Sequence, residues 1–405
     1  MAEDKFIFTS TLKKWLIYLV AGGVLLIIAG ILFIQLTPHG DAEHGAGHGP
    51  IWIDRLWTAI WVNNIYFTGI AVIGVFFVAV NYAAQSGWFV AMKRVPEAFG
   101  DWLPYAGIIT LAVFLIAGHT LFHWTHEGDD PIIEGKRLYL NQGFYIIRTI
   151  LYFVIWYMMY RQIRKYSLEE DLHGGVAYWH KVRKYSVIFI ILFAVTSSTA
   201  SWDWMMSVDP HWFSTLFGWY LFSGWFVTGL VVMTLITLGL KDNGYLSLVN
   251  QNHIHDLGKY IFAFSIFWVY LWFSQYMLIY YSNIPEESLY YVERLRSPVY
   301  KPMFFANIIL NFFFPFLVLM TRESKRHGIF LKIAGVLILV GHWVDFYLLV
   351  APSTVGDNGA IGLLEIGVTM LFTSAFLFVV FNALTKASLV ARNHPLLDES
   401  LHYHT

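Results

Sequence analysis

The chain alternates long apolar runs with short polar connections. Ten of the runs contain about 20 mostly apolar residues, which is the length that a helix needs to cross a bilayer core about 30 Å thick. We therefore predict an all-α integral membrane protein with ten transmembrane helices. Their predicted positions are residues 15–36, 57–82, 103–124, 142–162, 184–206, 211–240, 258–282, 300–320, 329–350 and 360–386.

Positively charged residues are distributed unevenly over the connections. Of the 26 Lys and Arg residues, 19 lie before the first helix, in the even-numbered loops or after the last helix, and 6 lie in the odd-numbered loops. Lys and Arg accumulate on the cytoplasmic side of membrane proteins. The distribution therefore predicts that both termini are cytoplasmic.

Composition narrows the class of function. A chain with 57% hydrophobic and 13% charged residues is not a soluble domain, and a net charge of −1 argues against nucleic-acid binding. The chain has no cysteine, so it cannot supply thiolate ligands to an iron–sulfur cluster, attach haem c or form a disulfide. Redox groups of these kinds would have to belong to a partner.

Histidines cluster in the third predicted helix. His119 and His123 are spaced at i and i+4, and His126 follows one turn later, so a continuous helix would place the three rings on one face. A proton relay, a metal or haem site and simple interhelical hydrogen bonds all fit this spacing. A haem-binding bundle needs facing histidine pairs about 13 or 14 residues apart, and a membrane di-iron site needs several histidine boxes. The chain has neither pattern, so we predict no metal site.

Other ionisable side chains also lie within predicted helices. His342 and Asp345 are spaced at i and i+3 and could share a proton or a hydrogen bond. Arg148 is flanked by tyrosines at helical spacing, and Asp203 follows a Ser/Thr cluster. Groups of this kind are costly to bury in a membrane, so each one either bonds to another helix or marks a functional path.

The depth of these residues leads to a further prediction. With the topology above, the strongly polar side chains fall in the outer half of the membrane, whereas the inner half offers mostly hydroxyl groups. This asymmetry predicts a buried polar pocket or half-channel that opens toward the outer face, and we expect Asp203, His342 and Asp345 to form one cluster in it. The predicted proton-transfer residues are Asp203, His342, Asp345, His119, His123, Arg148 and Glu365. For each of them, an interhelical hydrogen bond is the structural alternative.

Aromatic residues are numerous, with 17 Trp, 24 Tyr and 34 Phe. Most of them would form the core and the interfacial belts. A flat quinone headgroup would also suit a pocket with aromatic walls and a few proton-exchanging groups. The residues predicted for such a quinone pocket are Gln275, Tyr276 and Trp202.

Five segments together resemble one family. They are SWDWMMSVDPHWFSTLFGWY (201–220), FSQYMLIYYSNIPEE (273–287), NFFFPFLVLMTRESKR (311–326), GHWVDFYLLVAP (341–352) and NHPLLDESLHYH (393–404). They are similar to the NrfD-like (polysulfide-reductase-type) membrane subunits, and more narrowly to those of bacterial alternative complex III. The length and the tail resemble the smaller, ActF-type subunit of that complex. The resemblance extends from about residue 57 to the C-terminus.

The resemblance implies a helix arrangement and a location. Predicted helices 2 to 5 and 6 to 9 would form two four-helix bundles, with one peripheral helix at each end. The corresponding segments are 1–56 for the first helix and a His-rich outer loop, 57–206 and 207–350 for the two bundles, and 351–405 for the last helix and a cytoplasmic tail. The implied location is the bacterial cytoplasmic (inner) membrane.

The resemblance also implies a function. Complexes of this family oxidise menaquinol or ubiquinol and pass the electrons to cytochrome c or another acceptor. The implied partners are the larger NrfD-like subunit, an iron–sulfur subunit, haem c subunits, lipids and a terminal oxidase. Iron–sulfur clusters and haem c would lie in those partners, and the chain alone would hold no cofactor apart from contact with a quinone. Its expected role is proton conduction or coupling, and an ion or solute transporter or a purely structural scaffold subunit are the alternatives.

Overall fold

The computed structural model describes residues 5–36, 50–126 and 130–404, and this part of the chain is helical almost throughout. Ten of its helical segments are long and apolar enough to cross a membrane, which confirms the prediction of a multi-pass membrane protein. The His-rich outer loop predicted around His39, His44 and His48 lies outside the described residues.

The ten segments contain one to three helical elements each. They are α1 (Ser10–Leu36), α2 (Ile51–Ala83), α3 (Arg94–Phe99) with η2 (Gly100–Trp102) and α4 (Leu103–Leu121), α6 (Gln142–His173), α7 (Val176–Trp204), α8 (Phe217–Asp242), α9 (Gln251–Ser282), α11 (Tyr300–Ile308) with η5 (Ile309–Phe313) and α12 (Phe314–Leu319), α14 (Gly328–Val355) and α15 (Leu363–Leu384). Short elements join or flank them: η1 (Trp88–Met92), η3 (His123–Thr125), α5 (Pro131–Gly135), η4 (Met206–Val208), α10 (Pro285–Arg296), α13 (Arg322–Arg326), η6 (Gly356–Asn358) and α16 (Leu397–Leu401).

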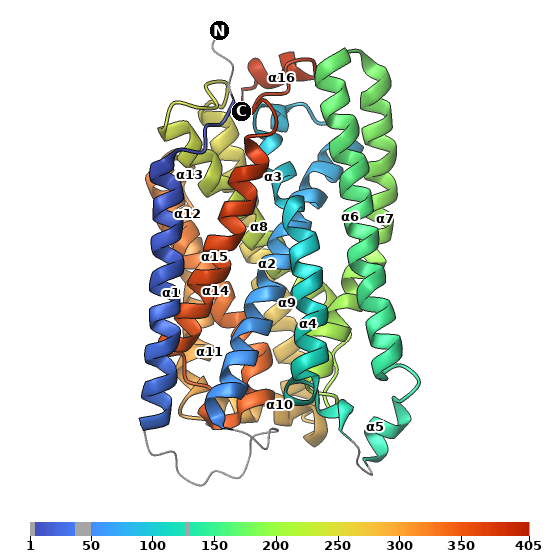
Figure 1. Cartoon of the computed structure of the whole chain (residues 1–405), viewed down its shortest axis with the longest axis vertical. Coiled ribbons are helices and arrows are strands. Elements are labelled where there is room, and N and C mark those ends of the chain that lie inside the picture. Colours follow the sequence, from blue (N-terminus) through green and yellow to red (C-terminus); the bar gives the residue numbers. More distant parts are fainter. Residues whose placement is uncertain (1–4, 37–49, 127–129, 405) are drawn as a thin grey trace.

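Helix α2 lies in the middle of the molecule (Figure 1). It packs against α4, α7, α8, α14 and α15, and its buried residues lie on every side of the helix. A helix surrounded in this way needs no polar face, which explains why its sequence is apolar all round.

Eight of the ten segments, α2 among them, form two groups of neighbours. In the first group, α2 contacts α4, α4 contacts α6, α6 contacts α7, and α7 contacts α2 again. In the second group, α8 contacts α9, α9 contacts α12, α12 contacts α14, and α14 contacts α8. Helix α1 packs mainly on α15, where Gly23 faces Gly367 so closely that a Cβ on Gly23 would lie 2.8 Å from the Gly367 carbonyl oxygen. Small residues permit this close approach between membrane helices.

Several predicted helix boundaries are wrong, among them the end at residue 162 and the start at residue 184, since α6 extends to His173 and α7 begins at Val176. The helix expected from residue 211 begins only at Phe217, and residues 205–216 contain η4 and irregular chain. Pro210 lies in this segment, and proline interrupts a helix because it lacks the backbone N–H. The helix expected over 103–124 ends at Leu121, after a non-helical turn at Ala117 with φ −122° and ψ 17°.

The amphipathic helix α10 was not predicted. Pro285 occupies its first turn together with Glu286 and Glu287, and Arg294 and Arg296 lie in its last turn. Proline and acidic residues favour a helix start, and basic residues favour a helix end. The signal was present, but the run is too polar to be found by a search for membrane helices.

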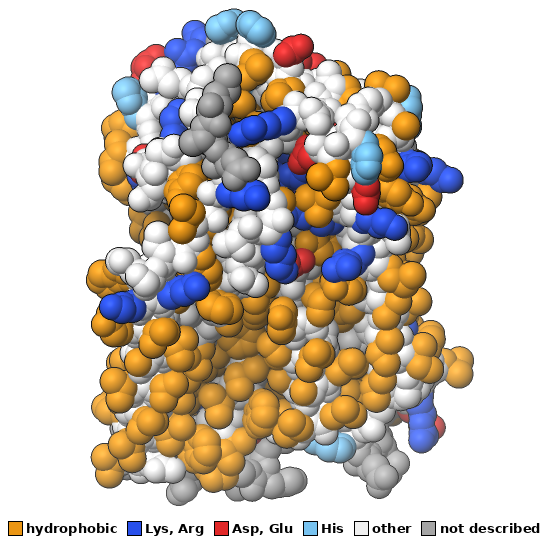
Figure 2. Space-filling model, turned by 45° about the horizontal axis from the view of Figure 1, so that its top comes forward, with side chains coloured by type: hydrophobic (Ala, Val, Ile, Leu, Met, Phe, Trp, Pro, Cys, Tyr) orange, Lys and Arg blue, Asp and Glu red, His pale blue; other side chains and the backbone are white. Residues whose placement is uncertain are grey.

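The two ends of the molecule differ in charge. The start of α1 and the short helix α16 lie at the same end, called the terminal end below, whereas α5 and α10 lie at the opposite end (Figure 1). Lys and Arg side chains gather toward the terminal end, and a largely apolar band covers the rest of the visible face (Figure 2). An apolar band of this kind is the surface that a helical bundle presents to lipid.

Candidate functional site

Asp345 lies at the centre of a buried network between the helices of the second group. Its side chain on α14 is only 3% exposed. The Tyr220 hydroxyl of α8 donates to Asp345 Oδ1, and the Asn307 amide of α11 donates to the same oxygen at 2.8 Å. The Asn311 amide of η5 donates in turn to Asn307 Oδ1 at 2.5 Å. Residues from α8, α11, η5 and α14 therefore converge on one carboxyl group.

The π-helical element η5 brings these amides together. Pro315 lies just after it, and because proline has no N–H it cannot bond to the carbonyl of Asn311, four residues earlier. Single π-helical turns occur where the regular hydrogen-bond ladder is interrupted, and they are frequent at functional sites. On the facing helix, a Cβ on Gly341 would lie 2.3 Å from Asn311 Oδ1. The absence of a side chain at Gly341 lets α14 approach η5.

His342 is buried next to this network but does not join it. Its side chain is completely buried, and neither ring nitrogen has a hydrogen-bond partner among the described residues. The ring meets Trp268 of α9 edge to face, with ring centroids 5.1 Å apart. The hydrogen bond that the spacing of His342 and Asp345 suggested is therefore not formed, and the donors to Asp345 Oδ1 are Tyr220 and Asn307.

Asp203 belongs to a different network, between α6 and α7. Arg148 Nε and Nη2 donate to its two carboxylate oxygens at 2.8 Å each, and the Tyr152 hydroxyl donates to Oδ2 at 2.8 Å. The guanidinium also donates to the Tyr139 carbonyl and makes cation–π contacts with the rings of Tyr139 and Phe144, at 3.9 and 4.1 Å from their centroids. Two-point arginine–carboxylate pairs of this kind are among the strongest ionic contacts in proteins.

The expectation of one cluster containing Asp203, His342 and Asp345 is wrong. Within the described parts of the chain, no hydrogen bond or ion pair joins the Asp203 network to the Asp345 network. Helix α2 packs against both α7 and α14, the helices that carry the two carboxylates. The sequence places the two acids at a similar predicted depth in the membrane, but they lie in different groups of helices.

The histidines of the third spanning segment do not share a helix face. Since α4 ends at Leu121, His123 begins η3, and its Nε2 lies 2.7 Å from the Ser353 carbonyl oxygen. His119 is exposed, and its Nδ1 lies 3.2 Å from Thr125 Oγ1. Its ring stacks on that of His126, with centroids 5.6 Å apart. Across residues 5–36, 50–126 and 130–404, no three His, Asp or Glu side chains are placed to hold a metal ion.

Glu365 ties α15 to α2. Its two carboxylate oxygens accept hydrogen bonds from Arg55 Nε and Nη2 at 2.8 Å each, and Oε2 also accepts from the Gly362 N–H at 2.8 Å. Both side chains are buried. Glu365 thus caps the first turn of α15 and neutralises Arg55, which is a structural role.

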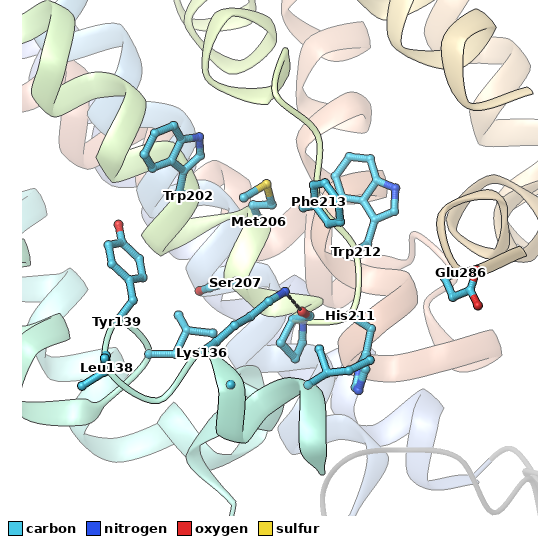
Figure 3. Close-up of a pocket in the computed structure, with 14 residues that line it drawn as sticks. Lys136, Leu138, Tyr139, Trp202, Met206, Ser207, His211, Trp212, Phe213 and Glu286 are labelled. Carbon is cyan, nitrogen blue, oxygen red and sulfur yellow. Dashed lines mark hydrogen bonds between the residues drawn. The ribbon is translucent and has the colours of Figure 1, made fainter. Parts of the chain in front are cut away.

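The predicted quinone residues are divided between two places. A pocket of about 620 Å³ opens at the opposite end of the molecule, and Trp202 lines it together with Tyr139 and Phe213 (Figure 3). Gln275 does not line this pocket. It donates to the Tyr291 hydroxyl at 3.1 Å and accepts from Ser214 at 3.0 Å.

Tyr276 does not line the pocket either, because its ring stacks on Trp272 with centroids 5.8 Å apart. The pocket itself has mostly aromatic and aliphatic walls. Lys136 lies in it, and its ammonium group donates to the Pro210 carbonyl at 2.6 Å (Figure 3). The other lining residues are Ile132, Gly135, Leu138, Leu140, Met206, Ser207, Pro210, His211, Trp212 and Glu286.

Sequence reasoning missed a further buried polar cluster, at the terminal end. Its core is a set of ion pairs in which Arg94 binds Glu97 at 2.6 Å and also Asp171, and Arg164 binds Glu97. The signal for it was the pair of charged stretches at 93–97 and 161–171 in a chain with few charges. Both stretches lie mostly outside the predicted helices 57–82, 103–124, 142–162 and 184–206.

A chain of weaker contacts extends this cluster to the C-terminal tail. Lys93 donates to the Tyr82 hydroxyl at 2.7 Å, and that hydroxyl donates to Glu170 Oε2 at 3.0 Å. His394 Nε2 lies 3.6 Å from Glu170 Oε1. Burial lowers the pKa of His394 to about 2 and also lowers the pKa of Lys93. Residues 88–102 reach this cluster because they fold back at the terminal end, where α3 and η2 pack against α2 and α15, and η1 packs against α16.

Comparison with known proteins assigns no family to the chain. No protein-family model matches it, and no curated protein matches it. The function has to be argued from the buried networks and from the motif resemblance.

Proposed function

We propose that the chain is a membrane subunit of a quinol-oxidising respiratory complex, and that the Asp345 network exchanges protons inside it. The motifs that resemble the NrfD-like subunits coincide with the buried networks. Asp203 lies in SWDWMM, His342 and Asp345 lie in GHWVDFY, and Asn311 and Pro315 lie in NFFFP. The motifs that carry the resemblance therefore contain the buried polar residues of these networks. This coincidence supports an ActF-type subunit of alternative complex III.

The observation that carries the proposal is the neutral surroundings of Asp345. Asp203 and Glu365 are each bound to an arginine, whereas no Lys, Arg or His in the described residues forms an ion pair with Asp345. A carboxyl group at membrane depth is costly when it is ionised without a cation. A carboxyl held only by a hydroxyl and an amide can gain or lose a proton without leaving an arginine unpaired. Asp345 is thus the proton-exchanging acid, and Asp203 and Glu365 stabilise the fold.

Further buried polar atoms continue from Asp345 toward the terminal end. Both ring nitrogens of His342, the Ser265 hydroxyl and the Thr237 hydroxyl are buried, and no group in the described chain bonds to them. Buried groups without a protein partner are ordinarily satisfied by ordered water. Water at these positions would carry protons between Asp345 and the terminal-end cluster.

The remaining features of the proposed subunit rest on the resemblance and the helix neighbours. The two groups α2, α4, α6, α7 and α8, α9, α12, α14 support the two four-helix bundles, with α1 and α15 as the peripheral helices. The charged terminal end would face the cytoplasm of a bacterial cell. Iron–sulfur and haem c groups would belong to partner subunits, because this chain has no cysteine.

The aromatic pocket at the opposite end is the proposed place of quinone contact. Its volume and its walls of Trp202, Trp212 and Phe213 suit a flat ring. Lys136 and Ser207 are committed within the protein, since Lys136 donates to the Pro210 carbonyl and Ser207 donates to the Asp203 carbonyl. The Tyr139 hydroxyl and Trp212 Nε1 are buried without a hydrogen-bond partner in the described chain. The pocket would hold a quinone through ring contacts and hydrogen bonds from these groups.

The test is a set of neutral substitutions in the assembled complex. Asp345→Asn should assemble normally but slow quinol oxidation or reduce the protons released per electron in proteoliposomes. Asp203→Asn should chiefly reduce assembly, because it leaves Arg148 buried without its partner. Asp357→Asn, at an exposed position of the opposite end, is the control and should match the parent.

Two other interpretations give different results in the same experiments. If Asp345→Asn matches the parent in rate and proton yield across pH 5 to 8, the chain is a structural scaffold. The break in the α11–α12 helix beside Asp345 also resembles the discontinuous helices of transporters. A chain that purifies without haem-bearing subunits and moves ions alone would be a transporter.

A further inference from the structure

A second pocket lies between α4, α6 and α15, toward the terminal end. Its volume is about 370 Å³. Helix α6 packs on α4, and α15 packs on α3 and η2 just before α4, so the two helices flank this segment. The lining residues are Asp101, Pro104, Tyr105, Ile108, Tyr157, Arg161, Phe378, Val379, Asn382 and Lys386.

Polarity in this pocket changes in order along the membrane axis. Helices α6 and α15 run toward the terminal end, so Arg161 lies one turn closer to that end than Tyr157. Lys386 lies just beyond the end of α15, closer to the terminal end than Phe378. The third wall runs the other way, from Asp101 at the terminal end to Ile108 farther in. On all three walls, the charged groups lie nearer the terminal end, and the apolar groups lie nearer the middle of the membrane.

The apolar part of the pocket faces outward. Ile108 is 68% exposed, Tyr105 52% and Phe378 50%. These residues lie within segments long and apolar enough to cross a membrane. Side chains of this kind at such positions contact acyl chains, and tyrosine is typical of the interface between headgroups and acyl chains.

The charged part of the pocket has one cation in excess. Lys386 Nζ donates to Asp101 Oδ2 at 3.0 Å, and the other oxygen of Asp101 accepts from the Tyr160 hydroxyl at 2.6 Å. Arg161 makes a cation–π contact with the Tyr157 ring, 5.9 Å from its centroid. No carboxylate in the described chain pairs with it. The pocket therefore presents a guanidinium group and a half-neutralised ammonium group to a ligand.

We propose that this pocket binds an anionic phospholipid from the leaflet at the terminal end. The phosphate diester lies against Arg161 and Lys386, and the acyl chains follow Ile108 and Phe378 toward the middle of the membrane. A pocket of this volume encloses the headgroup and the glycerol, and the acyl chains continue along the helix surface. Basic pockets between membrane helices on the cytoplasmic side recognise anionic headgroups by the same chemistry. A zwitterionic lipid fits less well because its own ammonium group would meet the excess cation.

The experiment measures lipid retention by native mass spectrometry of the full-length chain, purified in mild detergent with any bound partners. The probes are dioleoyl phosphatidylglycerol and dioleoyl phosphatidylcholine. We expect one molecule of phosphatidylglycerol to be retained about 10-fold more tightly than phosphatidylcholine. The double variant Arg161→Gln/Lys386→Gln should lose this preference. The control variant Arg183→Gln/Lys184→Gln also removes one arginine and one lysine near the terminal end, outside the pocket, and should retain the preference for phosphatidylglycerol.

A second variant separates the headgroup from the acyl chains. Ile108→Trp fills the apolar part of the pocket and should weaken retention of both lipids, with the basic residues unchanged. Glycerol 3-phosphate supplies the phosphate without the chains and should not displace the lipid at equal concentration. Equal retention of phosphatidylglycerol by the Arg161→Gln/Lys386→Gln variant would overturn the proposal. Displacement by glycerol 3-phosphate would also overturn it and would indicate a site for soluble phosphates.

Discussion

Two buried acids with different hydrogen-bond donors illustrate the chemistry of this chain at the scale of residues. Arg148 and Tyr152 surround Asp203, whereas Tyr220 and Asn307 surround Asp345. An arginine fixes the charge of its partner, because removing either member leaves the other buried and ionised. A hydroxyl and an amide leave the protonation state open. The donors, and not the depth alone, separate a structural acid from a proton-exchanging one.

The first prediction concerns the Arg148–Asp203 pair. Arg148→Met should destabilise the protein by about 3–5 kcal/mol, because Asp203 is then buried without its cation. The double variant Arg148→Met/Asp203→Leu should recover most of this loss. Thermal unfolding of the purified protein measures both effects, and Arg137→Met at an exposed position is the control. A double variant as unstable as Arg148→Met would contradict the pairing argument.

At the scale of elements, two features position the buried networks. One is the contact of η5 with α14, where Gly341 leaves room for Asn311. The other is the C-terminal tail, which lies against the terminal end. Ser400 Oγ donates to the Trp88 carbonyl at 3.0 Å and accepts from the Ala91 N–H at 3.2 Å. The tail also places His394 beside Glu170. Both features depend on residues far apart in the sequence.

A prediction for η5 follows from the space at Gly341. Gly341→Ala would place a Cβ 2.3 Å from Asn311 Oδ1 and 2.7 Å from Leu310 Cβ. The helices would have to separate, so we expect a loss of about 1–3 kcal/mol together with slower proton exchange through the Asp345 network. Gly239→Ala in α8 is the matched control, since nothing lies within 4 Å of the added Cβ. It should be neutral or slightly stabilising. Equal thermal stability of the two variants would show that the contact is unimportant.

A prediction for the tail follows from the surroundings of His394. Burial, with Lys93 acting in the same direction, lowers the pKa of His394 to about 2. The ring is neutral when the tail is attached and has a pKa of about 6.5 when the tail is free. Protonation therefore favours the free tail, and attachment should weaken as the pH falls below about 6.5.

Limited trypsin cleavage after Lys386 and Arg392 measures this release. Cleavage should be faster at pH 5 than at pH 8 once it is normalised to an unstructured peptide with the same bonds. His394→Asn should reduce this pH dependence, because asparagine does not titrate. His402→Asn, at an exposed position of the tail, should retain it. The same pH dependence in the His394 variant would locate the titrating group elsewhere.

At the scale of the whole molecule, the sequence predicted what depends on local properties. Run length and hydropathy located ten candidate spanning segments, because each segment must by itself be long and apolar enough to cross the membrane. Pairing between distant positions was not predictable in this way. Arg55 and Glu365 are 310 residues apart in the sequence. The periodicity of one helix does not show which residue of another helix its side chains contact. The terminal-end cluster was missed for the same reason, since Lys93 and Arg94 were counted as loop charges.

The last prediction concerns orientation in the membrane. If all ten candidate segments span the membrane, both termini are on one side, and the excess of Lys and Arg toward the terminal end predicts that this side is cytoplasmic (Figures 1 and 2). The chain has no cysteine, so a single introduced cysteine can be labelled without background. Leu138→Cys, at a position 94% exposed at the opposite end, should react with a membrane-impermeant maleimide in intact spheroplasts. His402→Cys should react only after the membrane is opened, and Ile28→Cys in the middle of α1 should stay unlabelled in lipid. The reverse labelling of Leu138→Cys and His402→Cys would invert the topology. It would also place the proposed phospholipid site in the outer leaflet.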